Sequence, residues 1–484
     1  MARAVVLPYP RFMLAAASLA LHTWSCTAGK ARLAATCGTY AVYENRAAAS
    51  GRKIALKFII IRAVHGSKRA IAWNPGGPGA SSTAFAGPIA DGGVSGELRT
   101  LRDRYDILLV DNRGTGGSAP QQCDFSPADR PALYFRQLWP DELVKSCRSR
   151  LARGADLSLY TTSVAADDLN DLRGALGYPK LVLDGSSYGT RLYLVYARRH
   201  PENVESIVLD GVAPPHFMII PLEDARGAQG SITRLIAECK ADAKCNVRFP
   251  SFGAHFTALV ERFDRGSVSV PLENSKTKRV TIVQLSKEVF ADRLRQLLYY
   301  PVSAAYTPFI IERAYRGDYG PLATMVDAVT QGFAGLVAEG LNLSVTCAED
   351  IPFITRSDVL RTSVNSFEGD LRVRAQQRAC TIWSVSPVAA GFMAPVRSDA
   401  PILMISGSDD PTSPPAFAEQ ALPYLPNARI LLIQNASHAT ETACGDNLIV
   451  EFVRAGTAKG LDLSRCGQAY HRPAFATSMS GFGN

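Results

Sequence analysis

The sequence has no run of lysine and arginine and no basic stripe interleaved with aromatic residues, although its 484 residues carry a formal net charge of +8. A nucleic-acid footprint needs such clustered charge, so we expect no nucleic-acid partner. No Cys-x-x-Cys pair and no cysteine–histidine cluster is present, so we expect no metal site. There is no internal repeat and no low-complexity linker. With 47% hydrophobic and 20% charged residues, the composition is that of a globular chain with a sizeable core.

Long apolar runs are also scarce. The run at residues 12–21 follows Arg3 and Arg11, precedes small residues and is too short to span a bilayer. This pattern is typical of a signal peptide, which we place at residues 1–28, with a buried hydrophobic helix as the alternative. No later run is long enough to cross a membrane. The sequence therefore predicts an exported protein that is secreted, periplasmic or part of the cell envelope. The residues before Cys26 match a lipid-attachment motif poorly.

The ten cysteines support export, because disulfides persist in oxidising compartments. Spacing does not determine connectivity, but eight cysteines fall into couples that are near in sequence and would close local loops. These couples are Cys123 with Cys147, Cys239 with Cys245, Cys347 with Cys380, and Cys444 with Cys466. Cys26 and Cys37 remain. They either pair with each other, or cleavage removes Cys26 and leaves Cys37 free.

Continuous apolar runs predict a mostly parallel sheet that is covered on both faces. They recur at residues 54–63, 70–74, 105–112, 180–185, 205–211, 401–407 and 428–434. Between about residues 212 and 398 this rhythm gives way to helical patterns with one strand-like interruption. The predicted fold class is α/β, with a largely helical cap inserted after the sixth core strand. The expected parts are a signal peptide (1–28), a first core part (29–211), the cap (212–398), a second core part (399–470) and a tail (471–484).

The segment KLVLDGSSYGT at residues 180–190 is a strand followed by a Gly-x-Ser-x-Gly turn, and a helical pattern follows it. This order is that of a nucleophile elbow, in which a tight turn between glycines exposes the central serine. The pentapeptide alone is weak evidence, whereas the flanking strand and helix strengthen it. We therefore predict that Ser187 is a nucleophile.

A glycine-rich loop, NPGGPGASS, follows the strand at residues 70–74. Its backbone N–H groups lack bulky neighbours, as an oxyanion hole requires. We expect one donor from Gly77 and the second from Tyr188, directly after the nucleophile. An ordinary turn is the alternative. A phosphate-binding loop is excluded because no Gly-Lys-Ser/Thr follows.

Two further strands end at chemically useful residues. The first precedes Asp409 and Asp410, and the second ends at His438, with a helical pattern between them. The order Ser…Asp…His is that of α/β-hydrolase triads, in which histidine takes the serine proton and the carboxylate orients the ring. From the residues alone, either aspartate could be the acid and the other a turn residue.

Several motifs together resemble secreted tripeptidyl aminopeptidases and the proline iminopeptidase group. They are the Asn-Pro-Gly-Gly-Pro-Gly loop from Asn74, the turn at 111–118, the helix from Tyr160 and the Gly-Ser-Asp-Asp-Pro-Thr-Ser-Pro segment from Gly407. The resemblance covers about residues 35–215 and 395–470, and it implies that Asp410, which precedes proline, is the triad acid. Ser413 stands where the family has threonine. The middle of the chain has no alignable motif.

The resemblance also implies a cap carboxylate that holds the substrate's α-ammonium group. Glu349, with Asp350 as second choice, is the candidate, because Cys347 could pin this segment; solvent-exposed acids at a helix end are the alternative. We therefore expect an exported, cofactor-free serine hydrolase that acts on peptides from the amino terminus. A carboxylesterase or lipase acting on small esters would have the same triad but no ammonium anchor. A non-catalytic binding protein would have lost a triad member, and none is missing.

Overall fold

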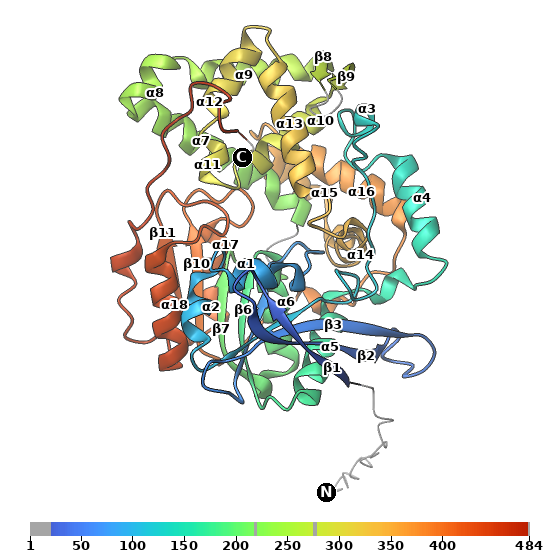
Figure 1. Ribbon diagram of the computed structural model, residues 1–484. Helices are drawn as coiled ribbons and strands as arrows, with labels where there is room; N and C mark the ends of the chain where they lie inside the picture. The colour runs from blue at the N-terminus through green and yellow to red at the C-terminus, as the bar shows by residue number, and fades with distance from the viewer. Residues whose placement is uncertain (1–20, 217–219, 274–277, 483–484) are drawn as a thin grey trace, which may run out of the picture.

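The computed structural model describes residues 21–216, 220–273 and 278–482, and it contains a nine-stranded sheet beneath a helical cap (Figure 1). The strands of the large sheet have the order β1-β2-β3-β5-β4-β6-β7-β10-β11. Neighbours from β1 to β5 are antiparallel, and those from β5 to β11 are parallel. The strands are β1 (Leu21–Ala28), β2 (Leu33–Tyr43), β3 (Lys53–Ile61), β4 (Ala70–Asn74), β5 (Asp106–Val110), β6 (Leu181–Ser186), β7 (Val204–Asp210), β10 (Ile402–Gly407) and β11 (Ala428–Ile433).

The parallel part of the sheet is buried on both faces, as its continuous apolar runs predict: every residue of β4, β5 and β10 is buried. Helices α5, α6 and α17 share one hydrophobic cluster with the sheet, and α1, α2 and α18 share the other. These helices are α1 (Ala86–Ala90), α2 (Gly96–Leu101), α5 (Thr162–Ala175), α6 (Tyr188–Arg199), α17 (Pro415–Ala421) and α18 (Ala443–Ala455). The predicted α/β class with a mostly parallel sheet is confirmed.

The cap connects β7 to β10, which pair in parallel in the sheet. The cap follows the seventh strand rather than the predicted sixth, and the edge strands β1 and β2 match none of the predicted apolar runs. The helices of the cap region are α7 (Ile220–Ala241), α8 (Ala243–Arg248), α9 (Phe252–Asp264), α10 (Lys287–Leu297), α11 (Pro301–Ala304), α12 (Thr307–Tyr315), α13 (Gly320–Phe333), α14 (Glu339–Glu349), α15 (Arg356–Ser363) and α16 (Leu371–Trp383). The strand-like interruption is the hairpin of β8 (Val268–Glu273) and β9 (Val280–Leu285).

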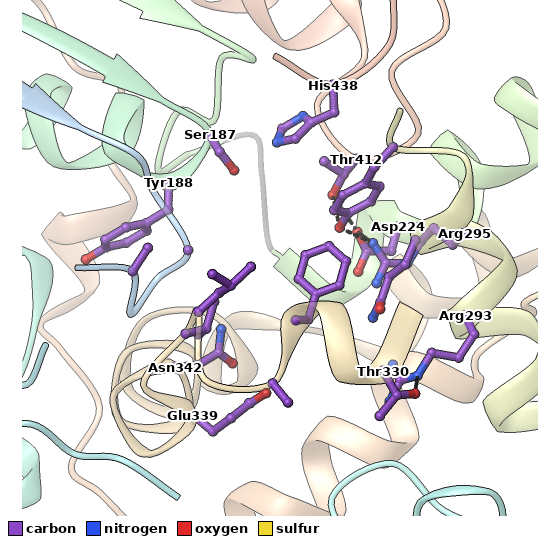
Figure 2. A pocket seen from close by; sticks show the side chains of 18 of the residues that line it. Ser187, Tyr188, Asp224, Arg293, Arg295, Thr330, Glu339, Asn342, Thr412 and His438 are labelled. Atoms are coloured by element: carbon purple, nitrogen blue, oxygen red, sulfur yellow. Dashed lines mark hydrogen bonds and ion pairs between the residues drawn. The ribbon is translucent and has the colours of Figure 1, made fainter. Parts of the chain in front are cut away.

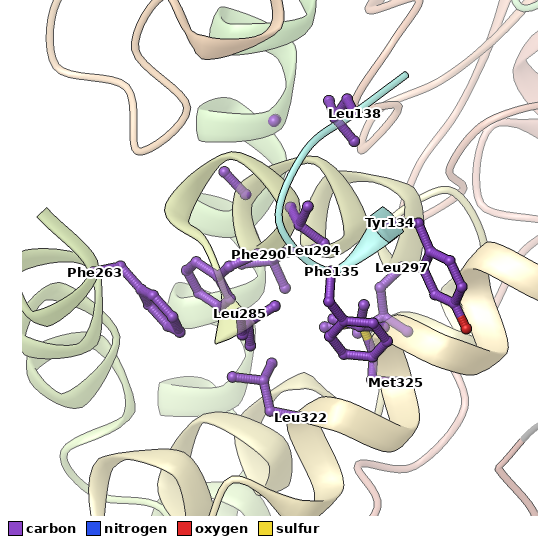
Figure 3. Packing of buried hydrophobic residues seen from close by; sticks show 14 of the residues in the cluster. Tyr134, Phe135, Leu138, Phe263, Leu285, Phe290, Leu294, Leu297, Leu322 and Met325 are labelled. Carbon is purple, nitrogen blue, oxygen red and sulfur yellow. The ribbon is translucent and has the colours of Figure 1, made fainter. Parts of the chain in front are cut away.

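The cap has a hydrophobic core of its own (Figure 3). Phe263 of α9 stacks on Phe290 of α10 with ring centroids 4.6 Å apart. The segment from Cys123 to Leu157, with α3 (Pro131–Tyr134) and α4 (Asp141–Leu151), contributes to this same cluster. Part of the expected first core segment therefore packs with the cap, so the cap is built from two stretches of chain.

The carboxyl-terminal residues also reach the cap. The N–H of Ala476 donates to Ala305 O at 3.0 Å, and Tyr306 Oη donates to Ser480 O at 2.9 Å. The predicted tail therefore runs from the core over the cap, which Figure 1 shows as the red segment ending at the label C.

The expected signal segment lies mostly outside the described residues, but its last part does not. Leu21–Ala28 forms β1, which pairs with β2 along its whole length. A cut at Ala28 would remove this strand, whereas a cut before Leu21 would leave it in place. Within the described ranges, no helix is long and apolar enough to cross a membrane.

All ten cysteines form disulfides. The four predicted couples are present, and Cys26 pairs with Cys37 across β1 and β2. The four predicted couples are confirmed, and Cys26 and Cys37 pair with each other in the uncleaved chain.

Candidate active site

Ser187 occupies the turn between β6 and α6 with φ 55° and ψ −126°, a strained backbone conformation for a residue with a side chain. Its N–H donates to Asp210 O at 2.8 Å. The flanking glycines are needed for steric reasons. A Cβ on Gly185 would lie 2.7 Å from Gly189 O, and one on Gly189 would lie 2.7 Å from Asn74 O. The turn therefore has the geometry of a nucleophile elbow, with Ser187 at the amino end of a helix.

Asp410 and His438 lie at the ends of the neighbouring strands and contact each other. His438 Nδ1 is 2.8 Å from Asp410 Oδ2. The other oxygen, Oδ1, accepts the N–H groups of Thr412 and Ser413, each at 2.8 Å. Asp409 points elsewhere and pairs with Arg234 at 2.8 Å. Of the two aspartates left open by the residues, Asp410 is the one that reaches the histidine.

The Ser413 side chain belongs to this arrangement, which the sequence did not suggest. Its Oγ donates to Asp410 Oδ2 at 2.6 Å and lies 3.0 Å from His438 Nδ1. The available signal was its place three residues after the aspartate, where a turn brings a hydroxyl back to the carboxylate.

Electrostatics favour an ionised Asp410 beside His438. Burial alone would raise the pKa of Asp410, but the histidine and the hydrogen bonds from Ser413 outweigh it, so the pKa is lowered. For His438, burial disfavours the charged ring, but the charge and the hydrogen bond of Asp410 raise its pKa above the usual value. The ionised Asp410 therefore stabilises the imidazolium form of His438, which is the form that the ring takes when it accepts a proton.

Ser187 and His438 line one cavity of about 300 Å³ (Figure 2). Nδ1 of the His438 imidazole is hydrogen-bonded to Asp410, so Nε2 is the ring nitrogen available to Ser187. Ser187 Oγ forms no hydrogen bond with another residue in the described part of the chain.

The glycine-rich loop lies directly against the elbow. Gly76 and Gly77 have φ of 97° and 118°, which side chains rarely adopt. A Cβ on Gly76 would lie 2.6 Å from Ser186 O and 3.0 Å from Tyr188 N. Gly77 and Tyr188 both line the cavity, and neither backbone N–H donates to another described residue. Two backbone donors are thus available beside Ser187.

Glu349 and Asp350, the expected ammonium anchors, are not among the residues lining the cavity. Glu349 is fully buried and accepts the N–H and the Oγ1 of Thr162, both at 2.6 Å. Asp350 pairs with Arg191 of α6 at 3.1 Å. Burial raises the pKa of Glu349 to about 7, although Arg191 and Thr162 lower it. Both acids lie near Arg191 of the elbow helix, and both are engaged by protein groups.

Two other acids do line the cavity, and the sequence analysis did not single them out. Asp224 accepts from Thr412 Oγ1 at 3.0 Å and lies 3.5 Å from Arg295. Glu339, the first residue of α14, contacts only Trp139 Nε1, at 3.5 Å, among the polar groups of the described residues. Burial raises the pKa of Glu339. Nothing in the local sequence distinguishes it from the acids at the other end of the same helix.

Comparison with known proteins agrees with this geometry. The α/β-hydrolase family model matches residues 74–237, which include the glycine-rich loop and the elbow, and the TAP-like protein model matches residues 366–465, which include Asp410 and His438. The chain is an α/β-hydrolase with a TAP-like carboxyl-terminal part. The family suggested by the sequence motifs is thereby confirmed, and the chain is a hydrolase of this fold.

Curated relatives of this α/β-hydrolase carry peptidase names. Serine protease Hip1 of Mycobacterium tuberculosis is 25% identical over 462 residues, covering 87% of this chain and 84% of the relative. Tripeptidyl aminopeptidase of Streptomyces lividans is 34% identical over 156 residues, covering 30% of this chain and 29% of the relative. Proline iminopeptidase of Xylella fastidiosa is 29% identical over 123 residues, covering 25% of this chain and 29% of the relative.

Proposed function

We propose that this α/β-hydrolase is an exported serine aminopeptidase that needs no cofactor and releases single residues or short peptides from the amino terminus of its substrates. The observation that carries the proposal is the hydrogen bond between Asp410 and His438, whose imidazole lines the same cavity as Ser187 on its elbow. The five disulfides support export.

In the proposed mechanism, Ser187 Oγ attacks the carbonyl carbon of the scissile bond while His438 Nε2 takes the hydroxyl proton. The N–H groups of Gly77 and Tyr188 hold the negative oxygen of the tetrahedral intermediate. His438 then gives its proton to the leaving amine, and an ester to Ser187 remains. Water, deprotonated by the same imidazole, hydrolyses this acyl-enzyme and restores the serine.

An aminopeptidase also needs a group that holds the substrate's α-ammonium, because an unpaired charge does not leave water for a cavity. We place this role on Glu339 rather than on Glu349 or Asp350. Glu339 faces the cavity with a single long hydrogen bond, whereas the other two are engaged by Thr162 and Arg191. The names of the relatives support amino-terminal cleavage.

Active-site labelling tests the nucleophile. A fluorophosphonate should attach one phosphonyl group to the peptide that contains Ser187, and Ser187→Ala should not be labelled. Labelling of that variant at the wild-type rate would contradict the assignment. Replacing Ser187 or His438 by alanine should each reduce turnover by several orders of magnitude, and the double variant should lose little more, because the three side chains act as a unit.

Substrate comparison separates aminopeptidase from esterase. N-acetylation of a chromogenic tripeptide amide removes the ammonium charge, so kcat/KM should fall by at least about a hundredfold. Glu339→Gln should lose much of the preference for the free amine. Equal rates on free and acetylated substrates in the wild-type enzyme would instead favour the carboxylesterase alternative, which the same triad supports.

A further inference from the structure

The cavity has an arginine-lined region on the side away from the proposed nucleophile. Arg293 and Arg372 both line it, together with Glu339 and Trp139. Figure 2 shows Arg293 and Glu339 opposite each other in this region, with Ser187 at the other side of the cavity.

Neighbouring side chains hold part of each guanidinium group. Arg293 donates from Nε to Thr330 Oγ1 at 2.7 Å and from Nη1 to Asp292. Arg372 also donates from Nη1 to Asp292, its Nε lies 3.7 Å from Asp224 Oδ2, and its guanidinium lies 4.6 Å from the centre of the Trp139 ring. The Nη2 of each arginine donates to no other residue in the described ranges. Both side chains are therefore oriented and still have N–H groups to offer a ligand.

Carboxylates lie beside the arginines of this region: Asp224 is 3.5 Å from Arg295 and 3.7 Å from Arg372, and Glu368 is 3.3 Å from Arg295. Asp292 is shared by Arg293, Arg295 and Arg372, which hold its pKa well below the usual range in spite of burial. Burial, together with Arg372 and Arg295, lowers the pKa of Arg293 more than Asp292 and Glu339 raise it. Glu339 forms no ion pair with either cavity arginine within the described residues. An anion entering between these groups would gain charge-assisted hydrogen bonds at sites that are already oriented.

We propose that Arg293 and Arg372 form a subsite for a substrate carboxylate, so that the enzyme prefers peptides with an acidic side chain on the amino-terminal side of the cleaved bond. This inference rests on the proposed aminopeptidase function. The Nη2 of each arginine can donate a charge-assisted hydrogen bond to a carboxylate oxygen, and the aromatic ring beneath Arg372 restricts the plane of its guanidinium. Glu339 and the arginines together offer one acidic and one basic contact, which complement the ammonium group and the acidic side chain of one short substrate segment.

Matched substrates test the subsite. Chromogenic tripeptide amides that differ only by Glu or Gln at the first, second or third position should be cleaved with different kcat/KM at one of these positions. We expect the Glu peptide to be favoured there by about tenfold or more in the wild-type enzyme. In Arg293→Gln and Arg372→Gln the ratio should fall toward one, whereas Arg293→Lys should keep an intermediate ratio, since the charge remains without the oriented Nη2 donor. The control Arg316→Gln, at an exposed arginine paired with Glu312, should keep the wild-type ratio.

Two results would overturn the subsite: no preference for Glu at any position in the wild-type enzyme, or a preference that survives in both glutamine variants. Where a glutamine variant fails to fold, the Glu-to-Gln substrate ratio of Arg293→Lys is the test of the subsite. Failure of the proposed function has a different signature, namely that no peptide amide is cleaved at all. In that case p-nitrophenyl esters of glutaric acid and of its monoamide are compared. A preference for the acid that Arg293→Gln removes would still support a carboxylate subsite, and equal rates on the two esters would refute it.

Discussion

Replacing the buried Asp184 by asparagine should flatten the pH dependence of stability. Asp184 lies on β6, three residues before the proposed nucleophile, and its Oδ2 is buried without a hydrogen-bond partner among the described residues. It lines a small cavity behind the elbow together with four other acids. These are Glu97, Asp210, Glu441 and Asp446. Burial, followed by the charge of Asp210, raises the pKa of Asp184 to about 8.

The sign of the effect follows from proton counting. An unfolded aspartate has a pKa of about 3.9, so between roughly pH 4 and pH 8 the folded state holds a proton that the unfolded state releases. The free energy of unfolding therefore falls as pH rises through this window. One such carboxyl contributes a slope of up to about 1.4 kcal/mol per pH unit, or about 2.7 kcal/mol between pH 5 and pH 7. Burial also raises the pKa of Asp210 to about 7 and of Asp446 to about 6, so these acids also lower the free energy of unfolding as pH rises.

The assay is denaturant unfolding of the oxidised protein at pH 5, 6 and 7, followed by fluorescence. Asp184→Asn keeps the shape of the side chain without a titrating proton. Relative to the wild-type protein, it should gain up to about 2.7 kcal/mol of stability between pH 5 and pH 7. The exposed Asp129→Asn is the matched control and should leave the curve unchanged. Parallel pH curves for Asp184→Asn and the wild-type protein would refute the reasoning.

Three further predictions concern the site and the disulfides. Asp410→Asn should reduce turnover on the order of ten-thousand-fold by favouring the wrong imidazole tautomer, whereas Asp409→Asn should reduce it only a few-fold. Steady-state kinetics of the two variants show which acid orients His438, and a larger loss in Asp409→Asn would refute the assignment. Because the pKa of His438 is raised, kcat/KM should fall with decreasing pH through a midpoint above 6.5, and a lower midpoint in the pH–rate profile would contradict the charge effect of Asp410. Replacing Cys347 and Cys380 together by alanine should lower the free energy of unfolding by roughly 2–4 kcal/mol, measured in urea, and an unchanged midpoint would show that this loop constraint contributes nothing.

The parallel strands could be predicted from the sequence because burial on both faces leaves a continuous apolar run in each of them. The edge strands could not. Most residues of β1 are exposed or half-buried, and β2 alternates between buried and half-buried positions. Leu21–Ala28 also follows an apolar run typical of a signal peptide. Its place in the sheet depends on pairing with β2, which no local pattern shows.

The triad candidates were predictable because each lies at the end of an apolar strand and the chain order is informative. The choice between Asp409 and Asp410 needed the resemblance, since the two are adjacent and differ only in direction. The buried positions of Glu349 and Asp350 could not be predicted. Arg191 lies in α6, far along the chain from Asp350, and its ion pair with this acid exists only once the cap is folded onto the elbow helix. Long-range ion pairs of this kind leave no periodic pattern in a sequence.

The cap positions the site as well as covering it. At the end of α10, Leu298 O accepts from Ser437 Oγ at 2.7 Å, and Tyr299 O accepts the backbone N–H of His438 at 3.1 Å. The rings of Tyr299 and His438 lie 5.2 Å apart. α10 also carries Arg293 and, packed in the cap core, Phe290. The helix that supplies Arg293 of the proposed carboxylate subsite therefore also holds the proposed catalytic base, so a shift of this helix would change substrate preference and proton transfer together.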